Sequence, residues 1–332
     1  MNFESLDWEV LDRLRETFLT DARTAGPYWH TVSDLEAYDQ TYAERIGWKW
    51  DAVLAELRRR QWTPPAGGTV FDWGCGSGVA GRRVLQAFGA AHFAGLRVHD
   101  HSPLAVDFAE HRARQSFPAL TVARADVRFL RGDEPIGLLV VSHVLNELDE
   151  TGRADLAALL ARAQSVLWVE PGTHEVGRAL SAWRERLQAE GLHAVAPCTH
   201  TAPCGLLAAG NERHWCHHFA EPPPDLFATS DWVRFGQRAG IDLRSLPYSF
   251  LVLDRRPVDP PADVARILGE PRLYKGYAKL FACSAAGVEE LTLQKRTDPD
   301  LFRQLKKSSG PLFYRWERTG TAITAATALW AE

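Results

Sequence analysis

No run of apolar residues in this 332-residue chain approaches the roughly eighteen that a membrane-spanning helix needs, so the sequence predicts no membrane span. The start contains Glu4, Asp7 and Glu9 and lacks the basic region and apolar stretch of a secretory signal. We therefore expect a cytoplasmic protein. In that reducing compartment its few cysteines, five in all, more often bind metal than form disulfides.

An excess of positive charge is also missing, since the net charge is −4, which argues against a uniformly basic nucleic-acid binder. The distribution is uneven. From Asp231 onward, 16 Lys+Arg and 12 Asp+Glu give +4, whereas the first 230 residues hold 22 and 30 and give −8. A basic C-terminal part can meet phosphates locally, although a solvated surface of mixed charge explains the same counts.

The first 66 residues are predicted to form a helical region. The stretch from Ser33 to Glu36 has the spacing of a capping box. Behind it, apolar residues recur every three or four positions from Leu35 to Leu57, which predicts one amphipathic helix.

Between residues 67 and 256, short apolar runs alternate with helical patterns. The predicted strands are Thr69–Asp72, Leu96–His99, Leu120–Ala123, Ile136–Ser142, Val166–Val169, His193–Ala196 and Ser249–Asp254. The predicted helices are Val79–Phe88, Pro103–Arg114, Arg153–Ala163, Val176–Glu190 and Asp231–Ala239. This alternation is typical of an α/β domain with a parallel sheet covered on both faces. A cysteine segment at 194–219 lies within it.

The last part of the chain, residues 257–332, follows a proline-rich linker at Arg255–Pro261. Its β-like runs at Tyr277–Cys283 and Glu289–Gln294 predict a small β subdomain.

A glycine-rich loop joins the first predicted strand to its helix. It contains Gly74, Gly76 and Gly78, which permit a tight turn and close approach of a ligand to the backbone. The next strand ends at Asp100, whose carboxylate can accept both hydroxyls of a ribose. Asp126 follows the third strand and can face an adenine amine. The loop therefore predicts a nucleotide-type cofactor.

These motifs resemble the class I S-adenosylmethionine-dependent methyltransferases, whose first motif is an acid followed by Gly-x-Gly-x-Gly, here Asp72 to Gly78. The resemblance implies a Rossmann-like seven-stranded sheet with one antiparallel strand, at Ser249–Asp254. It also implies that Asp72 lies near the methionine amine, Asp100 on the ribose and Asp126 near the adenine. A dinucleotide dehydrogenase is the competing interpretation, but it prefers a Gly-x-Gly-x-x-Gly spacing that this loop does not have.

The segment after the fourth strand, Ser142 to Leu148, is where substrate-side groups usually lie in this fold. It has neither the Asn-Pro-Pro-aromatic motif of exocyclic-amine methyltransferases nor the Pro-Cys pair of cytosine-C5 enzymes. His143 is a candidate general base, but we favour a polar residue that lines the cofactor pocket. The sequence predicts no catalytic residue.

Four cysteines lie outside the glycine loop: Cys198, Cys204, Cys216 and Cys283. Four thiols are what one iron–sulfur cluster or one structural zinc requires. Zinc on three of these cysteines, completed by the fourth or by a histidine, remains open on the residues alone. So do free buried thiols.

The cysteine segment has a second, more specific resemblance. Ala-Pro-Cys-Thr-His before Ala-Pro-Cys204, and Trp-Cys-His-His-Phe219, are similar to motifs of the mitochondrial small-ribosomal-subunit assembly proteins of the methyltransferase-like class and their bacterial relatives. Two departures are the doubled histidine and the Cys-Thr-His where Cys-Pro-His is usual. The resemblance implies a 4Fe–4S cluster on Cys198, Cys204, Cys216 and Cys283.

The same resemblance implies small-subunit, 16S-type ribosomal RNA as partner, with or without methyl transfer. A set of basic residues in the last quarter is then a candidate RNA face: Arg266, Arg272, Lys275, Lys279, Lys295, Arg296, Arg303, Lys306 and Lys307. Two alternatives stay open. One is an RNA-binding assembly factor without catalysis, and the other is a small-molecule methyltransferase with structural zinc. No oligomeric state is predicted.

Overall fold

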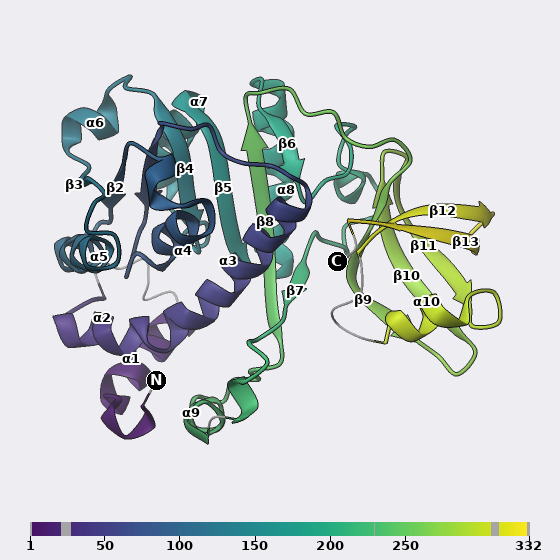
Figure 1. Cartoon of the computed structure of the whole chain (residues 1–332), viewed down its shortest axis with the longest axis horizontal. Coiled ribbons are helices and arrows are strands. Elements are labelled where there is room, and N and C mark those ends of the chain that lie inside the picture. Colours follow the sequence, from purple (N-terminus) through teal and green to yellow (C-terminus); the bar gives the residue numbers. More distant parts are fainter. Residues whose placement is uncertain (1, 21–27, 229, 307–311, 331–332) are drawn as a thin grey trace. The chain divides into compact units, whose positions relative to one another are not determined.

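The computed structural model describes residues 2–20, 28–228, 230–306 and 312–330 (Figure 1). The chain divides into two compact units. The first contains Met1–Leu54, Thr63–Val169 and Pro222–Leu246. The second contains Ala55–Trp62, Glu170–Glu221 and Pro247–Glu332. The three consecutive domains expected from the sequence stay a prediction.

The N-terminal helices of the chain are α1 (Trp8–Leu19), α2 (Val32–Asp39) and α3 (Tyr42–Arg59). The prediction of one continuous helix with a capping box at Ser33 was wrong. The capping box is formed by Thr31 and Asp34, and the helix stops after Asp39 before α3 begins. Asp34 is held there by Arg13, whose Nη2 donates to its carboxylate at 2.6 Å, and this ion pair explains why the cap lies earlier.

The main sheet has the order β3-β2-β1-β4-β5-β8-β6, with β7 added beside β8. Its strands are β1 (Thr69–Trp73), β2 (Gly95–His99), β3 (Val122–Arg124), β4 (Ile136–Ser142), β5 (Ala163–Pro171), β6 (His193–Ala196), β7 (His218–Ala220) and β8 (Leu246–Asp254). The pairs β1–β2, β1–β4, β2–β3 and β4–β5 are parallel, whereas β6 and β8 are antiparallel. This arrangement confirms the predicted class I methyltransferase fold.

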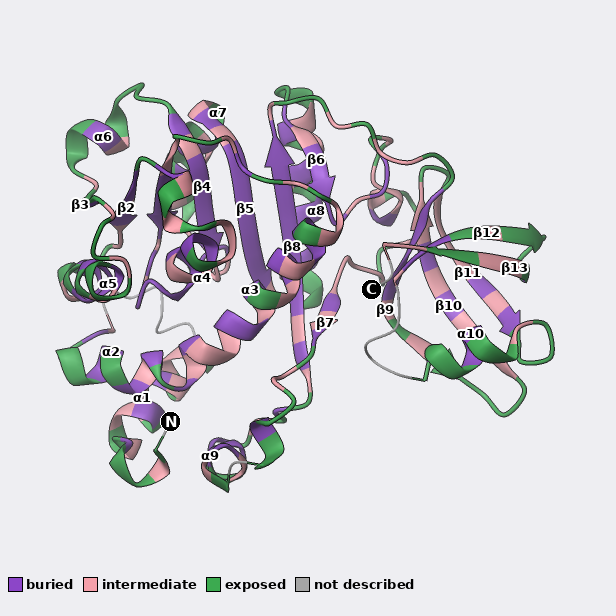
Figure 2. Ribbon diagram, in the orientation of Figure 1, coloured by how far each residue is buried: buried purple, intermediate pink, exposed green. Residues whose placement is uncertain are grey.

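Helices connect the parallel strands of the first unit. They are α4 (Val79–Phe88), α5 (Pro103–Ser116), α6 (Val127–Arg131) and α7 (Glu150–Arg162), and α9 (Ser230–Ala239) also belongs to this unit. Helix α4 packs on β1 and β4, α5 packs on β2 and β3, and α7 packs on β4. Strand β4 is buried along most of its length (Figure 2), and helices α4 and α7 pack on it.

The second unit contains α8 (His174–Ala189), strands β6 to β8 and a closed five-stranded barrel. The barrel is built from β9 (Ala265–Leu273), β10 (Tyr277–Ser284), β11 (Gly287–Gln294), β12 (Phe313–Thr319) and β13 (Ala322–Leu329), with α10 (Pro299–Gln304) between β11 and β12. Its core is formed by inward-facing residues such as Ile267, Leu280 and Leu293. The sequence predicted β10 and β11 but missed the other three strands.

No helix in the described ranges is both long enough and apolar enough to cross a membrane.

Candidate functional site

The glycine-rich loop lies at the carboxyl ends of the parallel strands, where β1 turns into α4. Gly74, Gly76 and Gly78 all have positive φ (70°, 52° and 76°), a conformation that other residues rarely adopt. A Cβ on Gly74 would lie 2.5 Å from Cγ1 of Val144, so this glycine is needed for packing. A Cβ on Gly76 would meet nothing within 4 Å, so Gly76 borders open space. The loop therefore has a tightly packed base and an accessible tip.

Asp72 is fully buried just before this loop. Its Oδ2 accepts a hydrogen bond from the backbone N–H of Gly81 at 3.0 Å. Among the described residues, no donor reaches its buried Oδ1. Burial raises the pKa of Asp72 to about 7, and the nearby Asp100 adds to this, while the Gly81 hydrogen bond and Arg82 oppose it. A buried carboxylate oxygen without a donor is a place that a ligand cation fits.

Asp100 follows β2 and connects it to the glycine loop. Its Oδ2 accepts from the N–H of Gly76 at 2.9 Å, and its Oδ1 accepts from the N–H of Ser102 at the same distance. Each oxygen retains a lone pair for a further donor, such as a ribose hydroxyl. Asp126 is exposed and caps α6 by accepting from the N–H of Phe129 at 2.7 Å. The cofactor roles of both residues stay predictions.

His143 stands at the end of β4 with a positive φ of 56°. Its Nε2 lies 3.2 Å from Nζ of Lys49, and its Nδ1 lies 3.4 Å from Oγ of Ser142. That hydroxyl also accepts from the indole N–H of Trp50 at 3.0 Å. Because an ammonium can only donate, Nε2 must be the acceptor and the ring hydrogen is on Nδ1. Burial, followed by the charge of Lys49, lowers the pKa of His143 well below its usual value.

The sequence indicated His143 but not its partners. Lys49 contacts the imidazole directly, and Trp50 contacts the hydroxyl of Ser142 beside it. These two residues lie on α3, more than ninety residues away along the chain. In the sequence they read as part of an amphipathic helix, and nothing in that pattern indicates their partner.

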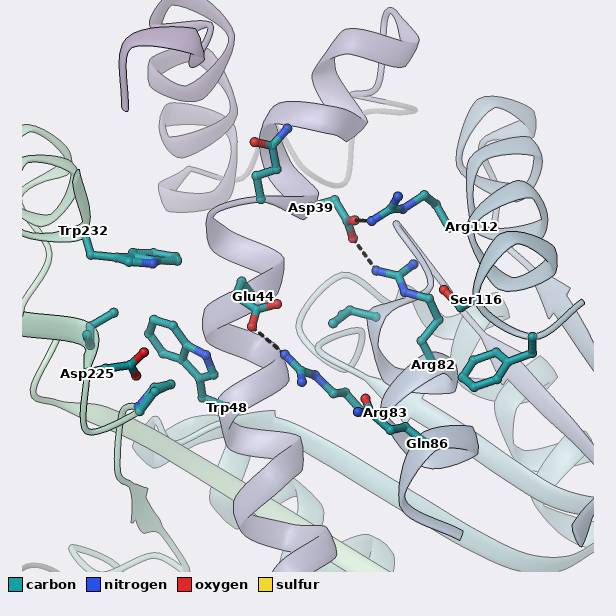
Figure 3. A pocket seen from close by; sticks show the side chains of 15 residues that line it. Asp39, Glu44, Trp48, Arg82, Arg83, Gln86, Arg112, Ser116, Asp225 and Trp232 are labelled. Carbon is teal, nitrogen blue, oxygen red and sulfur yellow. Dashed lines mark hydrogen bonds and ion pairs between the residues drawn. The ribbon is translucent and has the colours of Figure 1, made fainter. Parts of the chain in front are cut away.

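A separate open pocket of about 750 Å³ in the first unit is lined by residues of α2, α3, α4, α5 and α9 (Figure 3). Arg82 pairs with Asp39 at 2.6 Å, and Arg83 pairs with Glu44 at the same distance. Three arginines and three acidic residues line the pocket, so the formal charges of its lining sum to zero. None of the predicted cofactor residues lines it.

The four cysteines outside the loop all belong to the second unit. Cys198 and Cys204 follow β6, Cys216 lies two residues before β7, and Cys283 is in strand β10. The pKa of the Cys216 thiol is raised well above its usual value by burial first and then by the other three cysteines. Burial, with Cys198 and Cys204, raises the pKa of Cys283 to about 12. The structure thus brings the four sulfur atoms within electrostatic reach of one another.

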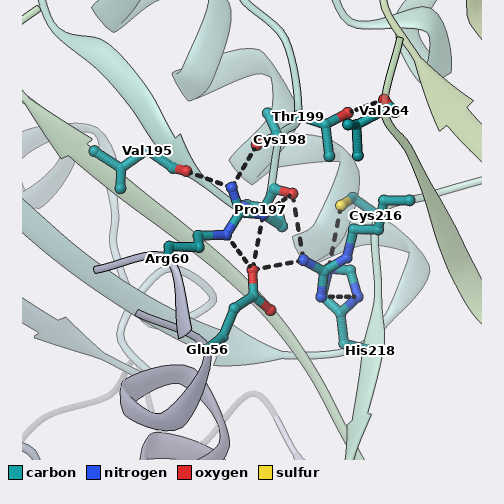
Figure 4. Close-up of polar contacts among 10 residues, drawn as sticks. Glu56, Arg60, Val195, Pro197, Cys198, Thr199, Cys216, His218 and Val264 are labelled. Carbon is teal, nitrogen blue, oxygen red and sulfur yellow. Dashed lines mark hydrogen bonds and ion pairs between the residues drawn. The ribbon is translucent and has the colours of Figure 1, made fainter. Parts of the chain in front are cut away.

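Basic and imidazole groups contact these sulfur atoms. Nε of Arg184 donates to Sγ of Cys198 at 3.2 Å. Sγ of Cys216 lies 3.5 Å from Nε2 of His218 (Figure 4). Sγ of Cys283 lies 3.6 Å from Nε2 of His200. Across the ranges that the structure describes, no three Cys, His, Asp or Glu side chains are arranged to hold a single metal ion. The metal site therefore stays a prediction.

A buried ion-pair network holds the backbone at the start of the cysteine segment (Figure 4). Oε1 of Glu56 accepts from Nε of Arg60 at 3.0 Å and from Nη1 of Arg266 at 2.7 Å. The three side chains are 3%, 7% and 2% exposed. Arg60 also donates to the carbonyl oxygens of Val195, Pro197 and Cys198 at 2.8, 2.9 and 3.0 Å. The backbone around Cys198 is thus fixed by a guanidinium that Glu56 orients.

This network corrects one part of the predicted RNA face. Arg266 is 2% exposed and bound to Glu56, so it is a structural cation and not a surface one. Lys279 is half-buried, and Lys307 lies outside the described residues. The remaining members are exposed: Arg272, Lys275, Lys295, Arg296, Arg303 and Lys306.

Several solved structures share parts of the backbone. A putative RNA methyltransferase from Pyrococcus horikoshii is 13% identical over 60% of this chain and 79% of that chain, with a TM-score of 0.37. The magnesium protoporphyrin IX methyltransferase of Synechocystis PCC 6803, with bound SAH, is 14% identical over 74% and 96%, with a TM-score of 0.40. An O-methyltransferase family protein from Burkholderia thailandensis is 16% identical over 76% and 70%, with a TM-score of 0.39. Similarities this weak carry no argument about activity.

Among curated proteins, none matches this chain. The sequence profile of one family does match. It is described as "Mitochondrial small ribosomal subunit Rsm22", and the match covers residues 41–313.

Proposed function

This chain belongs to the Rsm22 family of the small ribosomal subunit, and from that premise we propose that it is an S-adenosylmethionine-binding, iron–sulfur-containing protein that acts on small-subunit ribosomal RNA or its assembly. The observation that carries the proposal is the extent of the family match, since residues 41–313 contain both the glycine loop and all four cysteines. A cytoplasmic location is part of the proposal.

The glycine loop is the proposed S-adenosylmethionine site. Two observations support it: the buried Oδ1 of Asp72 lacks a donor among the described residues, and the tip of the loop at Gly76 borders open space. The ammonium of the methionine part would supply the missing donor to Asp72. Asp100, at the end of β2, would accept from the ribose hydroxyls. Bound S-adenosylmethionine supplies an electrophilic methyl group.

One observation favours binding without methyl transfer. Both ring nitrogens of His143, the one general-base candidate, contact protein groups, Lys49 at 3.2 Å and Ser142 at 3.4 Å, which fits a residue that lines the pocket. We therefore carry a second candidate function, that of a non-catalytic assembly factor that retains the cofactor. Incubation with tritiated S-adenosylmethionine and small-subunit precursors separates the two. Label in the RNA supports an enzyme. Cofactor binding by calorimetry without label supports a factor.

The four cysteines are the proposed ligands of a 4Fe–4S cluster. A tetrahedral zinc site has Zn–S bonds of about 2.3 Å and would hold its sulfur atoms about 4 Å apart. The thiolates of a cluster bind different iron atoms and lie farther apart, and four cysteines are the number that one cluster takes; zinc on the same residues is the alternative that metal analysis separates.

The test is anaerobic purification followed by iron, acid-labile sulfide and zinc analysis. We expect iron and sulfide in the native protein and their loss, with the visible absorption, in Cys216→Ser. The matched control is Cys75→Ser, because Cys75 is a buried cysteine of the glycine loop and outside the cluster of four. Zinc without iron, or unchanged iron in Cys216→Ser, would contradict the proposal.

A further inference from the structure

The connectivity of the C-terminal barrel identifies its type. Strands β9, β10 and β11 form an antiparallel meander, helix α10 follows, and β12 and β13 form a hairpin. The barrel closes by antiparallel pairing of β12 with β9 and parallel pairing of β11 with β13. A three-stranded meander, a helix between the third and fourth strands and this closure define the OB-fold. OB-folds bind oligonucleotides or oligosaccharides on strands two and three and on the loops that join strands one to two and four to five.

In this chain the second and third strands are β10 and β11. Along β10, Ala278, Leu280 and Ala282 are buried in the barrel, so the alternate side chains face outward. These outward residues are Tyr277, Lys279, Phe281 and Cys283. The proposed cluster ligand Cys283 therefore stands on the face that other OB-folds use for ligands.

The two ends of this face differ. At one end the cysteine segment covers it. There the ring of Phe281 stacks on His214 with centroids 4.4 Å apart, and Cys283 lies against His200. At the other end Tyr274 and Tyr277 stack with centroids 4.5 Å apart and ring planes 11° from parallel. Tyr274 is 44% exposed. An exposed, flat aromatic pair is thus left at the loop between β9 and β10.

Positive charge surrounds this pair. Arg272 precedes the pair in the chain and Lys275 lies between its two tyrosines, while Lys279 stands next to Tyr277 on the same face of β10. Glu290 of β11 pairs with both Arg272 and Lys279. These three cations and the one carboxylate that pairs with two of them leave an excess of positive charge, which favours a polyanion over a neutral oligosaccharide.

From this juxtaposition we propose that the tyrosine end of the barrel, formed by Tyr274, Tyr277, Arg272, Lys275 and Lys279, binds single-stranded RNA. A base stacks on the exposed face of Tyr274, and the phosphates run beside the three cations. Stacking of this kind tolerates any base, because every base has a π-face. The choice of RNA over DNA rests on the proposed function, whereas the surface itself depends on neither S-adenosylmethionine nor the cluster.

The test uses the full-length protein and a fluorescein-labelled single-stranded RNA of mixed sequence, with binding followed by fluorescence anisotropy. Tyr274→Ala should weaken binding by about 5- to 150-fold, the range for loss of one stacked base. Tyr274→Phe keeps the ring and should bind as the native protein does. Lys275→Gln should lower the slope of log affinity against log salt by about 0.7. Phe227→Ala is the matched control, since Phe227 is an exposed aromatic, 51% accessible, outside the barrel.

Three results would overturn the inference: no binding of single strands by the native protein, equal binding by Tyr274→Ala, or equal affinity for a duplex of the same sequence. Tighter binding of a DNA strand of the same sequence would overturn the choice of RNA. Repeating the titration with iron-depleted protein and without S-adenosylmethionine keeps this test independent of the proposed function. If cluster or cofactor analysis fails while Tyr274→Ala still weakens binding, only the proposed function is refuted.

Discussion

Replacement of Glu56 by glutamine should destabilise the protein far more than replacement of a comparable surface glutamate. Glu56 is 3% exposed and accepts from two buried arginines, Arg60 and Arg266. Glutamine keeps the shape but removes the negative charge, which leaves two buried guanidinium groups without a counter-charge. A hydrogen bond to a charged group contributes about 1.5–3 kcal/mol, and breaking a buried ion pair costs about 3–5 kcal/mol. We expect Glu56→Gln to lower the free energy of unfolding by about 3–5 kcal/mol.

The assay is urea denaturation at pH 7, followed by circular dichroism. Glu190→Gln is the matched control, because Glu190 and Arg186 also form an i,i+4 pair at the end of a helix, but with side chains 39% and 54% exposed. An exposed pair of this kind contributes less than about 1 kcal/mol. If the two variants lose the same stability, the reasoning that burial decides the value of the Glu56 pair is refuted.

The pH dependence gives a second test of the same pair. Burial raises the pKa of Glu56, but Arg266 and Arg60 outweigh it, so the pKa is lowered from 4.5. A lowered pKa in the folded state means that the pair contributes fully above the unfolded value of about 4.5 and loses its contribution as the pH falls below it. The difference between native protein and Glu56→Gln should therefore shrink in acid. A difference that is constant from pH 7 to pH 3 would contradict this.

Three further predictions concern the two candidate sites. Because the pKa of Asp72 is raised to about 7, we expect affinity for S-adenosylmethionine to rise as the pH increases through 7. Asp72→Asn should bind about 10- to 150-fold more weakly with no such dependence, and a pH-dependent Kd in this variant would refute the role of the carboxylate. Gly74→Ala should cost about 1–3 kcal/mol in urea denaturation, because its Cβ would meet Val144 at 2.5 Å, whereas Gly76→Ala, which meets nothing within 4 Å, should cost less. Arg184→Ala should lower the iron retained per chain and shift the visible absorption, and Arg184→Lys should restore part of it. Unchanged iron content and spectrum in Arg184→Ala would show that the N–H···S contact does not support the site.

Much of the methyltransferase fold could be predicted from the sequence. The bounds of α4, β4 and β6 agree with the structure because each is a short apolar or amphipathic run between clear breaks. Helix α2 was predicted with the wrong start. A capping motif at Ser33 competes with one at Thr31, and Arg13 stabilises the second through Asp34. Local patterns cannot rank two caps when a tertiary contact decides between them.

The barrel shows where periodicity fails. In β13, Ala322 to Leu329, small and polar residues predominate and only Ile323 is buried, so no alternation marks a strand. The pairing of β13 with β11 and of β12 with β9 closes the barrel. These pairs join segments that are far apart in sequence. The recognition of an OB-fold, and of its exposed tyrosines, therefore needed the structure.

By itself, the sequence determined the alternation of strands and helices, the glycine loop with its acids, and the identity of the four cysteines. These follow from residue type and short-range spacing, which the backbone obeys locally. Only the tertiary structure decided that Arg266 is buried on Glu56, 210 residues away, that Lys49 contacts His143, and that Cys283 approaches the other cysteines. The physical reason is that burial and charge pairing depend on which distant surfaces meet, and local sequence patterns carry no information about that.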